Sequence, residues 1–494
     1  MGKEKTQHNL KQKAASSMVW TAFQKYSKMG VTFISGIILA RLLTPFDYGC
    51  IGMLAIFMVL AEQFIDGGFG SALIQKKCPT QEDYSTIFFW NIGMAGLLYA
   101  VLFFAAPAIS RFYNIPILCD VLRVQGIVLF IYAFNLVQRN QLKKKLNFKI
   151  LSIISITTSV VALGVTIFMA YKGFGVWALV TQNLITAAIP ALFFWFYVKW
   201  RPILTFSWKS FKELFAFGFY MFLTHLISSF SLQLQGLLIG KVYNPSTMGY
   251  YSKAQGTEMT ASHSISSVIT QVSYPLYSQA QNDQMAMINM IRRLSMTIAY
   301  ITMPLMAILI IIAKPLFVLL YSDRWLQSVP YFQVLCLAGA ISCLMSVNLQ
   351  PIAAIGKSKV MFVWSMVKCA LRIGLVVGGL LLFGMKGLLI GIVIVNWISY
   401  IINSCLVSKY IGYELLSQIK DLLPIIVVAT SAAVISYLLG RLIGLGMYLD
   451  GAFTMLIFII LYMGWSLVFK PEAYTYTLSI IPSKFRFWEK KTNK

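Results

Sequence analysis

Residues 36–77 read GIILARLLTPFDYGCIGMLAIFMVLAEQFIDGGFGSALIQKK, and this stretch determines the fold that we expect for the chain. One apolar run ends at the polar corner around Pro45, and a second apolar run follows directly. The second run ends at the glycine cluster 67–70 and the pair Lys76-Lys77. Because proline pushes the residue before it out of the α region, Pro45 separates two helices. The stretch therefore predicts a hairpin of two hydrophobic helices.

The same corner occurs again 200 residues later. Residues 40–49 read ARLLTPFDYG and residues 240–249 read GKVYNPSTMG, so that the proline and the final glycine coincide. Further matches follow in the same order at offsets of 200–214. An ordered repeat of this length indicates a duplicated architecture, which many transporters have.

The composition is that of an integral membrane protein. Of the 494 residues, 58% are hydrophobic and 12% are charged, and the mean hydropathy is +0.74. Apolar runs longer than ~18 residues recur along the chain, which is typical of membrane-spanning helices. We expect an all-α integral membrane protein of about fourteen transmembrane helices, arranged as two pseudo-symmetric six-helix lobes and two C-terminal helices.

The net charge of +25 would suggest nucleic-acid binding in a soluble protein. Here the cations lie in short loops between apolar runs, as in the cytoplasmic loops of membrane proteins, so we expect no nucleic-acid partner. The seven cysteines are scattered and form no C-x-x-C pair. We interpret them as free thiols and expect no metal site.

The apolar runs divide the chain into six segments. We expect a cytoplasmic N-terminal tail at 1–16, a first lobe at 17–198, an interfacial linker at 199–210, a second lobe at 211–409, two helices within 420–469 and a cytoplasmic basic tail at 470–494. The helices of the lobes are expected at about 17–43, 47–66, 84–109, 116–140, 148–171, 173–198, 211–240, 246–275, 285–313, 328–352, 359–383 and 386–409. Because six helices per lobe leave both lobes with the same sidedness, the pseudo-twofold axis should run along the membrane normal.

The distribution of lysine and arginine predicts the orientation. With the N-terminus in the cytoplasm, 27 of the 41 cations lie in cytoplasmic segments, 8 in outer corners and 6 within spans. Cytoplasmic loops carry the excess of Lys and Arg, so both termini are expected in the cytoplasm.

Three stretches resemble a known family: the corner ILARLLTPFDYG, the following helix to IDGGFGSALIQKK, and GYYSKAQ at 249–255. They are similar to the Wzx-type polysaccharide flippases, in the branch of the colanic acid and teichuronic acid exporters of the multidrug/oligosaccharidyl-lipid/polysaccharide transporter superfamily. The resemblance implies a multi-pass protein of the bacterial plasma (inner) membrane with two lobes around a central cavity. It also implies a substrate, an oligosaccharide unit on undecaprenyl pyrophosphate, that moves from the cytoplasmic to the outer leaflet by alternating access. The product would be a surface polysaccharide such as O antigen, capsule or exopolysaccharide.

Six cations within the spans are the candidate substrate-binding residues. Each costs roughly 2.5–3.5 kcal/mol at a helix centre, so these side chains should face a wet cavity or a partner. A diphosphate would be attracted to such a cavity, and arginine suits phosphate oxygens best. The set is Lys25, Lys28, Arg123, Lys253, Lys368 and Arg372. Snorkelling to the headgroups is an equal alternative for Lys25, Arg123 and Lys253, whereas Lys368 and Arg372 lie near mid-membrane.

Three acids are the candidates for coupling transport to an ion, H⁺ or Na⁺: Glu258, Glu62 and Asp66. Glu258 lies close to mid-depth and could titrate near neutrality. Alternatively it forms a fixed ion pair with Arg372 or Lys253. No other cofactor is expected.

Several other functions fit a polytopic membrane protein. A multidrug cation antiporter would need an acidic cavity, and a lipid II flippase is disfavoured only by the resemblance. A membrane polysaccharide polymerase or glycosyltransferase would need a larger outer loop or a carboxylate site, and the sequence has no nucleotide-binding loop or nucleophile constellation. We therefore expect a transporter and no enzyme. Its partners would be the lipid-linked oligosaccharide, membrane lipids and a polysaccharide polymerase with its chain-length proteins.

Overall fold

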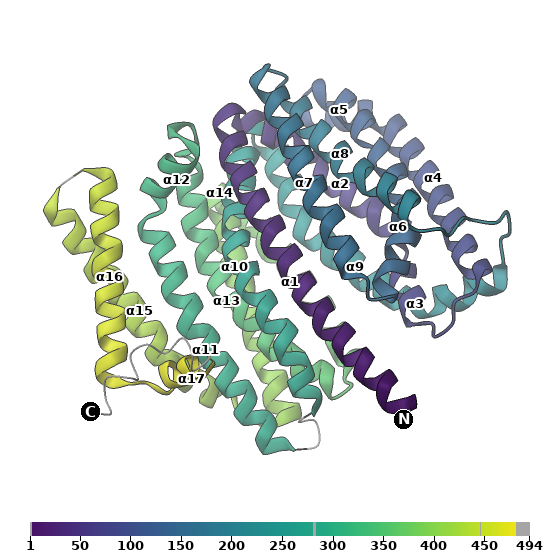
Figure 1. Cartoon of the computed structure of the whole chain (residues 1–494). Helices are drawn as coiled ribbons and strands as arrows, with labels where there is room; N and C mark the ends of the chain where they lie inside the picture. Colours follow the sequence, from purple (N-terminus) through teal and green to yellow (C-terminus); the bar gives the residue numbers. More distant parts are fainter. Residues whose placement is uncertain (1, 280–282, 445, 481–494) are drawn as a thin grey trace. The chain divides into compact units, whose positions relative to one another are not determined.

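Helices account for all the regular structure in the part of the chain that the structure describes. This computed structural model describes residues 2–279, 283–444 and 446–480 (Figure 1). Within these ranges it contains seventeen α-helices and one 3₁₀-helix. The expected all-α membrane fold is confirmed.

Two compact units divide the chain, Met1–Ser252 and Lys253–Lys494. The boundary lies inside one helix, α10 (Pro245–Gln279), and α9 (Trp208–Val242) packs on α2 (Pro45–Asp66) within the first unit. A division into compact units does not show where one repeat ends and the next begins. The lobes expected at 17–198 and 211–409 therefore stay a prediction.

The first unit contains the helices up to α9 and the start of α10. In it α1 packs along α7, α7 along α8, and α6 against both α4 and α8 (Figure 1). Besides α2 and α9, its helices are α1 (Gly2–Leu42), α3 (Phe69–Gln75), α4 (Gln81–Tyr113), α5 (Ile117–Gln125), α6 (Ile127–Lys144), α7 (Phe148–Tyr171) and α8 (Val176–Tyr197). The first helix begins at Gly2, so the segment 2–16 that we expected as a tail continues the first helix.

The polar corner before α2 begins that helix with a capping box. Pro45 is the first helical residue, and the Thr44 side chain accepts a hydrogen bond from the Asp47 backbone N–H. Asp47 returns the contact by accepting from the Thr44 backbone N–H at 2.9 Å. In the second corner Asn244 accepts from the Thr247 backbone N–H at 2.8 Å. Both copies thus satisfy the exposed N–H groups of a helix that starts with proline.

The final glycines of the two corners lie against each other's proline. A Cβ atom on Gly49 would overlap the carbonyl oxygen of Pro245, and a Cβ atom on Gly249 would overlap that of Pro45. The contact is reciprocal, as a local twofold relation between the two corners requires. Only glycine allows backbones to approach this closely.

The glycine cluster after α2 breaks the helix and receives α9. Gly67 and Gly68 have φ angles of 53° and 79°, in the left-handed region that glycine adopts without strain. A Cβ atom on Gly68 would overlap the carbonyl oxygen of Gly218 in α9. The cluster therefore both ends α2 and allows α9 to pack against the turn.

The second unit contains the rest of α10 and the helices that follow. α11 packs against α13, α15 and α17, and α13 packs against α14. These elements are α11 (Gln284–Ile311), α12 (Ala313–Tyr321), η1 (Asp323–Trp325), α13 (Ser328–Ala354), α14 (Ser358–Ile411), α15 (Leu415–Ile443), α16 (Met447–Phe469) and α17 (Glu472–Ile480). The last of them is a helix within the expected tail 470–494, of which 481–494 lie outside the described residues.

Helix α14 is a hairpin of two antiparallel helices. Its 54 residues contain a non-helical position at Gly384, with φ 62° and ψ −144°. A Cβ atom on Gly379 would overlap the backbone of Gly387, so the two halves touch directly beside the bend. The halves correspond to the helices expected at 359–383 and 386–409.

Eleven helices of the described chain are long and apolar enough to cross a membrane, with α14 counted once. Since α14 is bent into two, it supplies one more crossing. α1 and α10 are long enough as well, with 41 and 35 residues, but they are more polar. The expected number of about fourteen spans includes both. The expected helix 116–140 corresponds to α5 and α6, which meet at Gly126 and together form one candidate span, Ile117–Lys144.

Candidate functional site

A polar cavity of about 220 Å³ lies within the first unit, between α1, α6, α7 and α8. Two cations line it, Lys28 from α1 and Arg139 from α6. The polar side chains beside them are Gln24, Tyr132, Asn135, Ser155, Thr158, Ser159 and Thr186. Cations inside apolar helices are expensive, and a wet cavity is the environment that they require. Of the predicted residues, Lys28 therefore has a defined place in a cavity, while Lys25 is partly buried on the same helix.

The first unit also contains two of the predicted acids. The Glu62 carboxylate interacts electrostatically with Arg139, and that of Asp66 with Lys143 and His225. Asp66 also accepts hydrogen bonds from the backbone N–H groups of Gly68 and Gly70. It thereby caps the start of α3, which gives Asp66 a structural task at the helix break.

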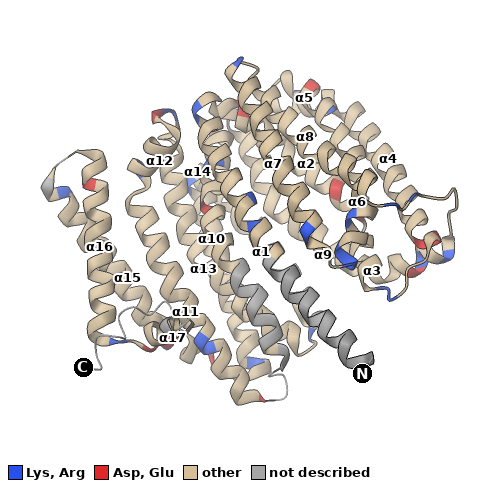
Figure 2. Cartoon of the chain, viewed as in Figure 1, with Lys and Arg blue, Asp and Glu red and all other residues tan. Residues whose placement is uncertain are grey.

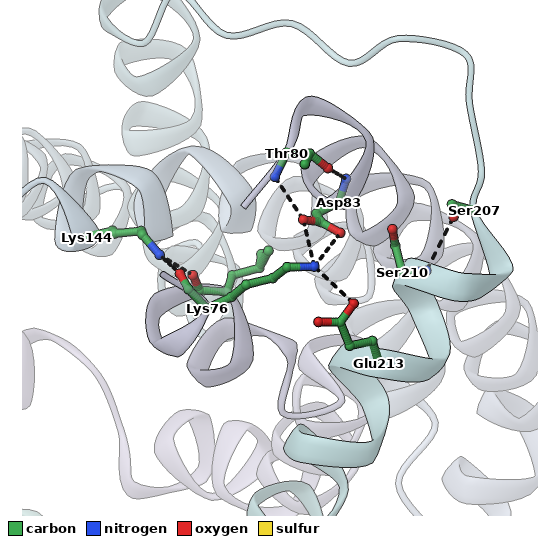
Figure 3. Close-up of polar contacts among 8 residues, drawn as sticks. Lys76, Thr80, Asp83, Lys144, Ser207, Ser210 and Glu213 are labelled. Carbon is green, nitrogen blue, oxygen red and sulfur yellow. Dashed lines mark hydrogen bonds and ion pairs between the residues drawn. The ribbon is translucent and has the colours of Figure 1, made fainter. Parts of the chain in front are cut away.

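A second charged cluster joins α3, α4 and α9, and Figure 3 shows Lys76 at its centre. The Lys76 ammonium lies 3.1 Å from the Asp83 carboxylate and 3.2 Å from that of Glu213. Burial alone would lower the pKa of Lys76, but the hydrogen bonds with Asp83 and Glu213 outweigh it and raise this pKa. Lys144 donates to the carbonyl oxygens of Leu73, at 3.0 Å, and of Lys76. The cluster holds the end of α3 against the starts of α4 and α9.

Arg123 lies on the short helix α5. Its guanidinium carbon lies 4.5 Å from the centroid of the Phe103 ring of α4, in a cation–π contact. Among the described residues its Nε atom has no hydrogen-bond partner. The Phe103 ring thus stabilises the charge of the Arg123 guanidinium, which we predicted to bind substrate.

In the second unit Lys253 lies in an aromatic setting. Its ammonium is 4.0 Å from the ring centroid of Tyr321 and 5.7 Å from that of Trp325. Both rings are buried, and they supply the cation–π contacts that a buried ammonium needs.

Glu258 is buried on the same helix, with 7% of its surface exposed. It is hydrogen-bonded to Ser262, and its Oε1 atom lies so close to Gly339 of α13 that a Cβ atom there would overlap it. This oxygen has no hydrogen-bond partner in the described part of the chain. The coupling role predicted for Glu258 and its predicted pairing with Lys253 or Arg372 both stay predictions.

Lys368 and Arg372 lie on the first half of the α14 hairpin and are held by asparagines of the second half. Lys368 donates to the Asn403 side chain at 2.9 Å, and Arg372 to that of Asn396 at 3.0 Å. Asn396 in turn donates to the Ala338 carbonyl oxygen at 3.4 Å. A neutral amide orients a cation without cancelling its charge, so these two bonds fix the directions of both cationic groups.

The charged residues outside these sites gather toward the helix ends within each unit (Figure 2). In the second unit Arg292 of α11 forms ion pairs at 2.9 Å with Asp421 of α15 and with Glu472 of α17. Tyr413 also donates to Asp421, at 2.6 Å. This cluster ties α17, the helix within the expected tail, to the rest of its unit.

Three candidate site residues were not predicted from the sequence: Arg139, Asn396 and Asn403. Arg139 counted only as a loop cation, although its position after the apolar run of α6 also permits a place in a cavity. Asn396 and Asn403 are seven residues apart within an apolar run, so they share a helix face. That spacing, read together with Lys368 and Arg372 on the preceding helix, was the available signal.

This chain matches a family model and several proteins of known name. The model of the family described as "Polysaccharide biosynthesis protein" matches residues 38–330. The teichuronic acid biosynthesis protein TuaB of Bacillus subtilis (strain 168) is 23% identical over 71% of this chain and 73% of its own. The lipopolysaccharide biosynthesis protein WzxC of Escherichia coli (strain K12) is 22% identical over 87% of this chain and 88% of its own.

Solved transporter structures are similar at lower identity. The lipid II flippase MurJ in an inward closed conformation has a TM-score of 0.73 at 16% identity, over 92% of this chain and 98% of its own. An inward-facing MATE multidrug resistance transporter of the MOP superfamily has a TM-score of 0.61 at 16% identity, over 80% of this chain and 98% of its own. At such identities the likeness shows the fold, which is that of multi-pass membrane transporters. Since the family match spans more than half of the sequence, the chain belongs to the family of polysaccharide biosynthesis proteins, as its resemblance to the Wzx-type flippases implied.

Proposed function

We propose that this protein is a flippase. It moves undecaprenyl-pyrophosphate-linked oligosaccharide units from the cytoplasmic to the outer leaflet of the bacterial plasma membrane by alternating access, for export of a surface polysaccharide. Family membership supports the polysaccharide part of this proposal, and the fold supports transport rather than catalysis. A relative named as the succinoglycan biosynthesis transport protein ExoT of Rhizobium meliloti (strain 1021), 21% identical over 79% of this chain, supports both.

The observation that carries the choice of substrate is the positive charge inside apolar helices. Lys28 and Arg139 line one cavity, and asparagines orient Lys368 and Arg372. A diphosphate or another anion on a lipid matches such groups, whereas a cationic drug would be repelled by them. A multidrug cation antiporter is therefore disfavoured.

A lipid II flippase is the second candidate, because MurJ has the same fold and lipid II would meet the same charges. The family match and the named relatives favour an exported polysaccharide instead.

Coupling to H⁺ or Na⁺ belongs to the same proposal. Glu258 is the first candidate because it is buried with one unpartnered oxygen among the described residues. Glu62, whose carboxylate interacts electrostatically with Arg139, is the second. The proposal also has both termini in the cytoplasm, which the distribution of Lys and Arg supports, and a polysaccharide polymerase with its chain-length proteins would receive the flipped unit.

Deletion of the gene followed by lipid analysis tests the proposal. We expect an undecaprenyl-diphosphate oligosaccharide to accumulate on the cytoplasmic side and surface polysaccharide to be lost, with both reversed by a plasmid copy. Accumulation of lipid II would support the second candidate. Normal lipids together with normal polysaccharide export would contradict both.

A further inference from the structure

An apolar groove of about 350 Å³ lies between α6 and α8 of the first unit. Among its lining side chains, Phe134 and Leu192 are exposed. All six lining residues are apolar: Phe130, Ile131, Phe134, Ala188, Ala191 and Leu192. Because both helices are long and apolar enough to cross a membrane, the exposed side of this groove meets lipid hydrocarbon. An alkyl chain therefore matches the groove.

A stacked pair of rings connects this groove to a cation. The Phe134 and Trp195 rings lie 4.6 Å apart, and the Trp195 indole N–H donates to the Phe134 carbonyl oxygen at 3.0 Å. Trp195 stands one turn beyond Leu192, toward the C-terminal end of α8. The guanidinium carbon of Arg201 lies 5.0 Å from the centroid of the Trp195 ring. The groove thus ends beside a positive charge.

Arg201 is oriented by backbone carbonyl groups at the end of α8. It donates to the carbonyl oxygens of Val198 and Trp200, at 2.8 Å each, and to that of Trp195 at 2.7 Å. A guanidinium has five N–H groups, so two of them remain for an acceptor outside the described chain. Since the side chain is also exposed, Arg201 is a fixed cation that an external anion can reach.

The backbone that carries Arg201 is held in place as well. Residues 199–207 of the expected linker are non-helical and lie along the start of α4. The Gln81 side chain donates to the Arg201 carbonyl oxygen at 2.6 Å, and the Ile203 backbone N–H donates to the Ser85 hydroxyl at 3.1 Å. The linker is therefore a fixed part of the first unit.

The side chains of the linker place it at the level of the lipid headgroups. Leu204 is 94% exposed, and the other exposed apolar side chains are Ile203, Phe206 and Trp208. Apolar and aromatic side chains that stand beside cations at the end of a span are typical of the membrane interface. We therefore expect Arg201 at the depth of the lipid phosphates.

Positive charge is unbalanced within this segment. Residues 195–212 contain no acid, and the next residue, Glu213, is paired with Lys76 at 3.2 Å. The four cations of the segment are all exposed: Lys199, Arg201, Lys209 and Lys212. Basic residues next to spanning helices attract anionic lipid headgroups.

We propose that one anionic phospholipid of the surrounding bilayer binds here, with an acyl chain in the groove between α6 and α8 and its phosphate at Arg201 and Lys199. The charge count predicts that this end of the helices faces the cytoplasmic leaflet. No residue lines both this groove and the polar cavity of the first unit. The site therefore binds a lipid of the membrane and is separate from the transport proposed above.

Native mass spectrometry of the full-length protein in detergent, titrated with phosphatidylglycerol, tests the proposal. Phosphatidylcholine with the same acyl chains is the comparison lipid, because it has no net charge. We expect phosphatidylglycerol to bind more tightly. Arg201→Gln should weaken its binding roughly tenfold and leave phosphatidylcholine unchanged, and Arg201→Lys should keep part of the preference.

A substitution in the groove tests the acyl-chain half of the site. Ala188→Trp would fill the groove, so it should weaken both lipids to a similar degree and preserve the preference for phosphatidylglycerol. Lys199→Gln leaves the carbonyl bonds of Arg201 in place and should weaken phosphatidylglycerol severalfold. It keeps the headgroup prediction testable if Arg201→Gln disturbs the linker.

Arg111→Gln is the matched control. Arg111 lies at the other end of α4 and also donates to a carbonyl oxygen of its own helix, that of Pro107, at 3.3 Å. This variant should bind both lipids like the unmodified protein, and all variants should have equal gel-filtration profiles and melting temperatures without lipid. Equal binding of the two lipids, or equal effects of Arg201→Gln and Arg111→Gln, would overturn the proposal.

A competition experiment separates a bilayer lipid from a polyprenyl carrier lipid. Undecaprenyl phosphate is added to the protein with bound phosphatidylglycerol. We expect it to displace phosphatidylglycerol only at higher concentration than unlabelled phosphatidylglycerol does. Displacement at lower concentration would assign the groove to a polyprenyl chain and refute the proposed phospholipid site.

Discussion

At the residue scale, single glycines decide which backbones can meet. Gly49 and Gly249 each admit the carbonyl oxygen of the proline in the opposite corner, and Gly339 admits the Glu258 carboxylate. Gly49 and Gly249 are the final residues of the repeated corners, so the repeat already marked their positions. It did not show their reciprocal contact.

Replacing Gly49 by alanine should destabilise the protein strongly. The new methyl group would overlap the Pro245 carbonyl oxygen, which belongs to backbone and has little room to move. We expect a loss at or above the ~1–3 kcal/mol of core overpacking, measured as a lower melting temperature and a lower folded yield in detergent. Gly164→Ala in α7 is the control, since a Cβ atom there meets no atom within 4 Å. Equal melting temperatures of the two variants would contradict the reciprocal contact.

Arg372→Ala should abolish export while the protein remains inserted, because the proposed substrate loses a cation that Asn396 orients. Arg372→Lys should recover only part of the export, since an ammonium lacks the guanidinium fork. The measurement is exported polysaccharide per inserted molecule. A purely structural ion pair predicts a different outcome, in which Arg372→Ala lowers the protein level and a second change, Glu258→Ala, restores both level and export.

At the element scale, ion pairs join helices at the ends of each unit. Lys76 links α3 with α4 and α9, and Arg292 links α11 with α15 and α17. The partners differ in exposure, with 1% for the Asp83 side chain and 60% for that of Glu213. The buried Asp83 should therefore contribute more to stability than the exposed Glu213.

Asp83→Ala should reduce the free energy of unfolding by about 1–3 kcal/mol, and Glu213→Ala by less than ~1 kcal/mol. Asp83 is buried and also accepts from the Thr80 backbone N–H at 2.8 Å, so its removal takes away a helix cap as well as an ion pair. Glu213 forms a solvent-exposed pair. Melting temperatures of both purified variants are the measurement, and a larger loss in Glu213→Ala would refute the ranking.

At the scale of the whole molecule, the orientation in the membrane follows from the charge count. An Asn244→Cys variant on a cysteine-free background should react with an impermeant thiol reagent from outside intact cells, because the corner 241–247 is predicted to be extracytoplasmic. A cysteine in the loop at Lys357 should react only after the cells are opened. Labelling of Asn244→Cys from the cytoplasmic side alone would refute the two-lobe topology.

The sequence by itself determined the class of the protein, the hairpin corners and the approximate number of helices. These follow from local properties: apolar runs set the spans, proline and capping residues set the corners, and the repeat shows as matching letters. The bend at Gly384 was placed between 383 and 386 for the same reason, because the apolar run pauses there. The six cations within the apolar runs were recognised because a charged residue stands out in an apolar run.

Only the tertiary structure decided what those cations contact. Arg139 lines the same cavity as Lys28 but comes from a helix distant in sequence. Asn403 and Asn396 contact Lys368 and Arg372 from the other half of the α14 hairpin. Hydropathy alone does not tell which helices are neighbours. The same holds for the close packing at Gly49 and Gly68, where backbones meet without side chains. A site built across packed helices depends on their rotation and register, and these are set by contacts between residues far apart in the chain.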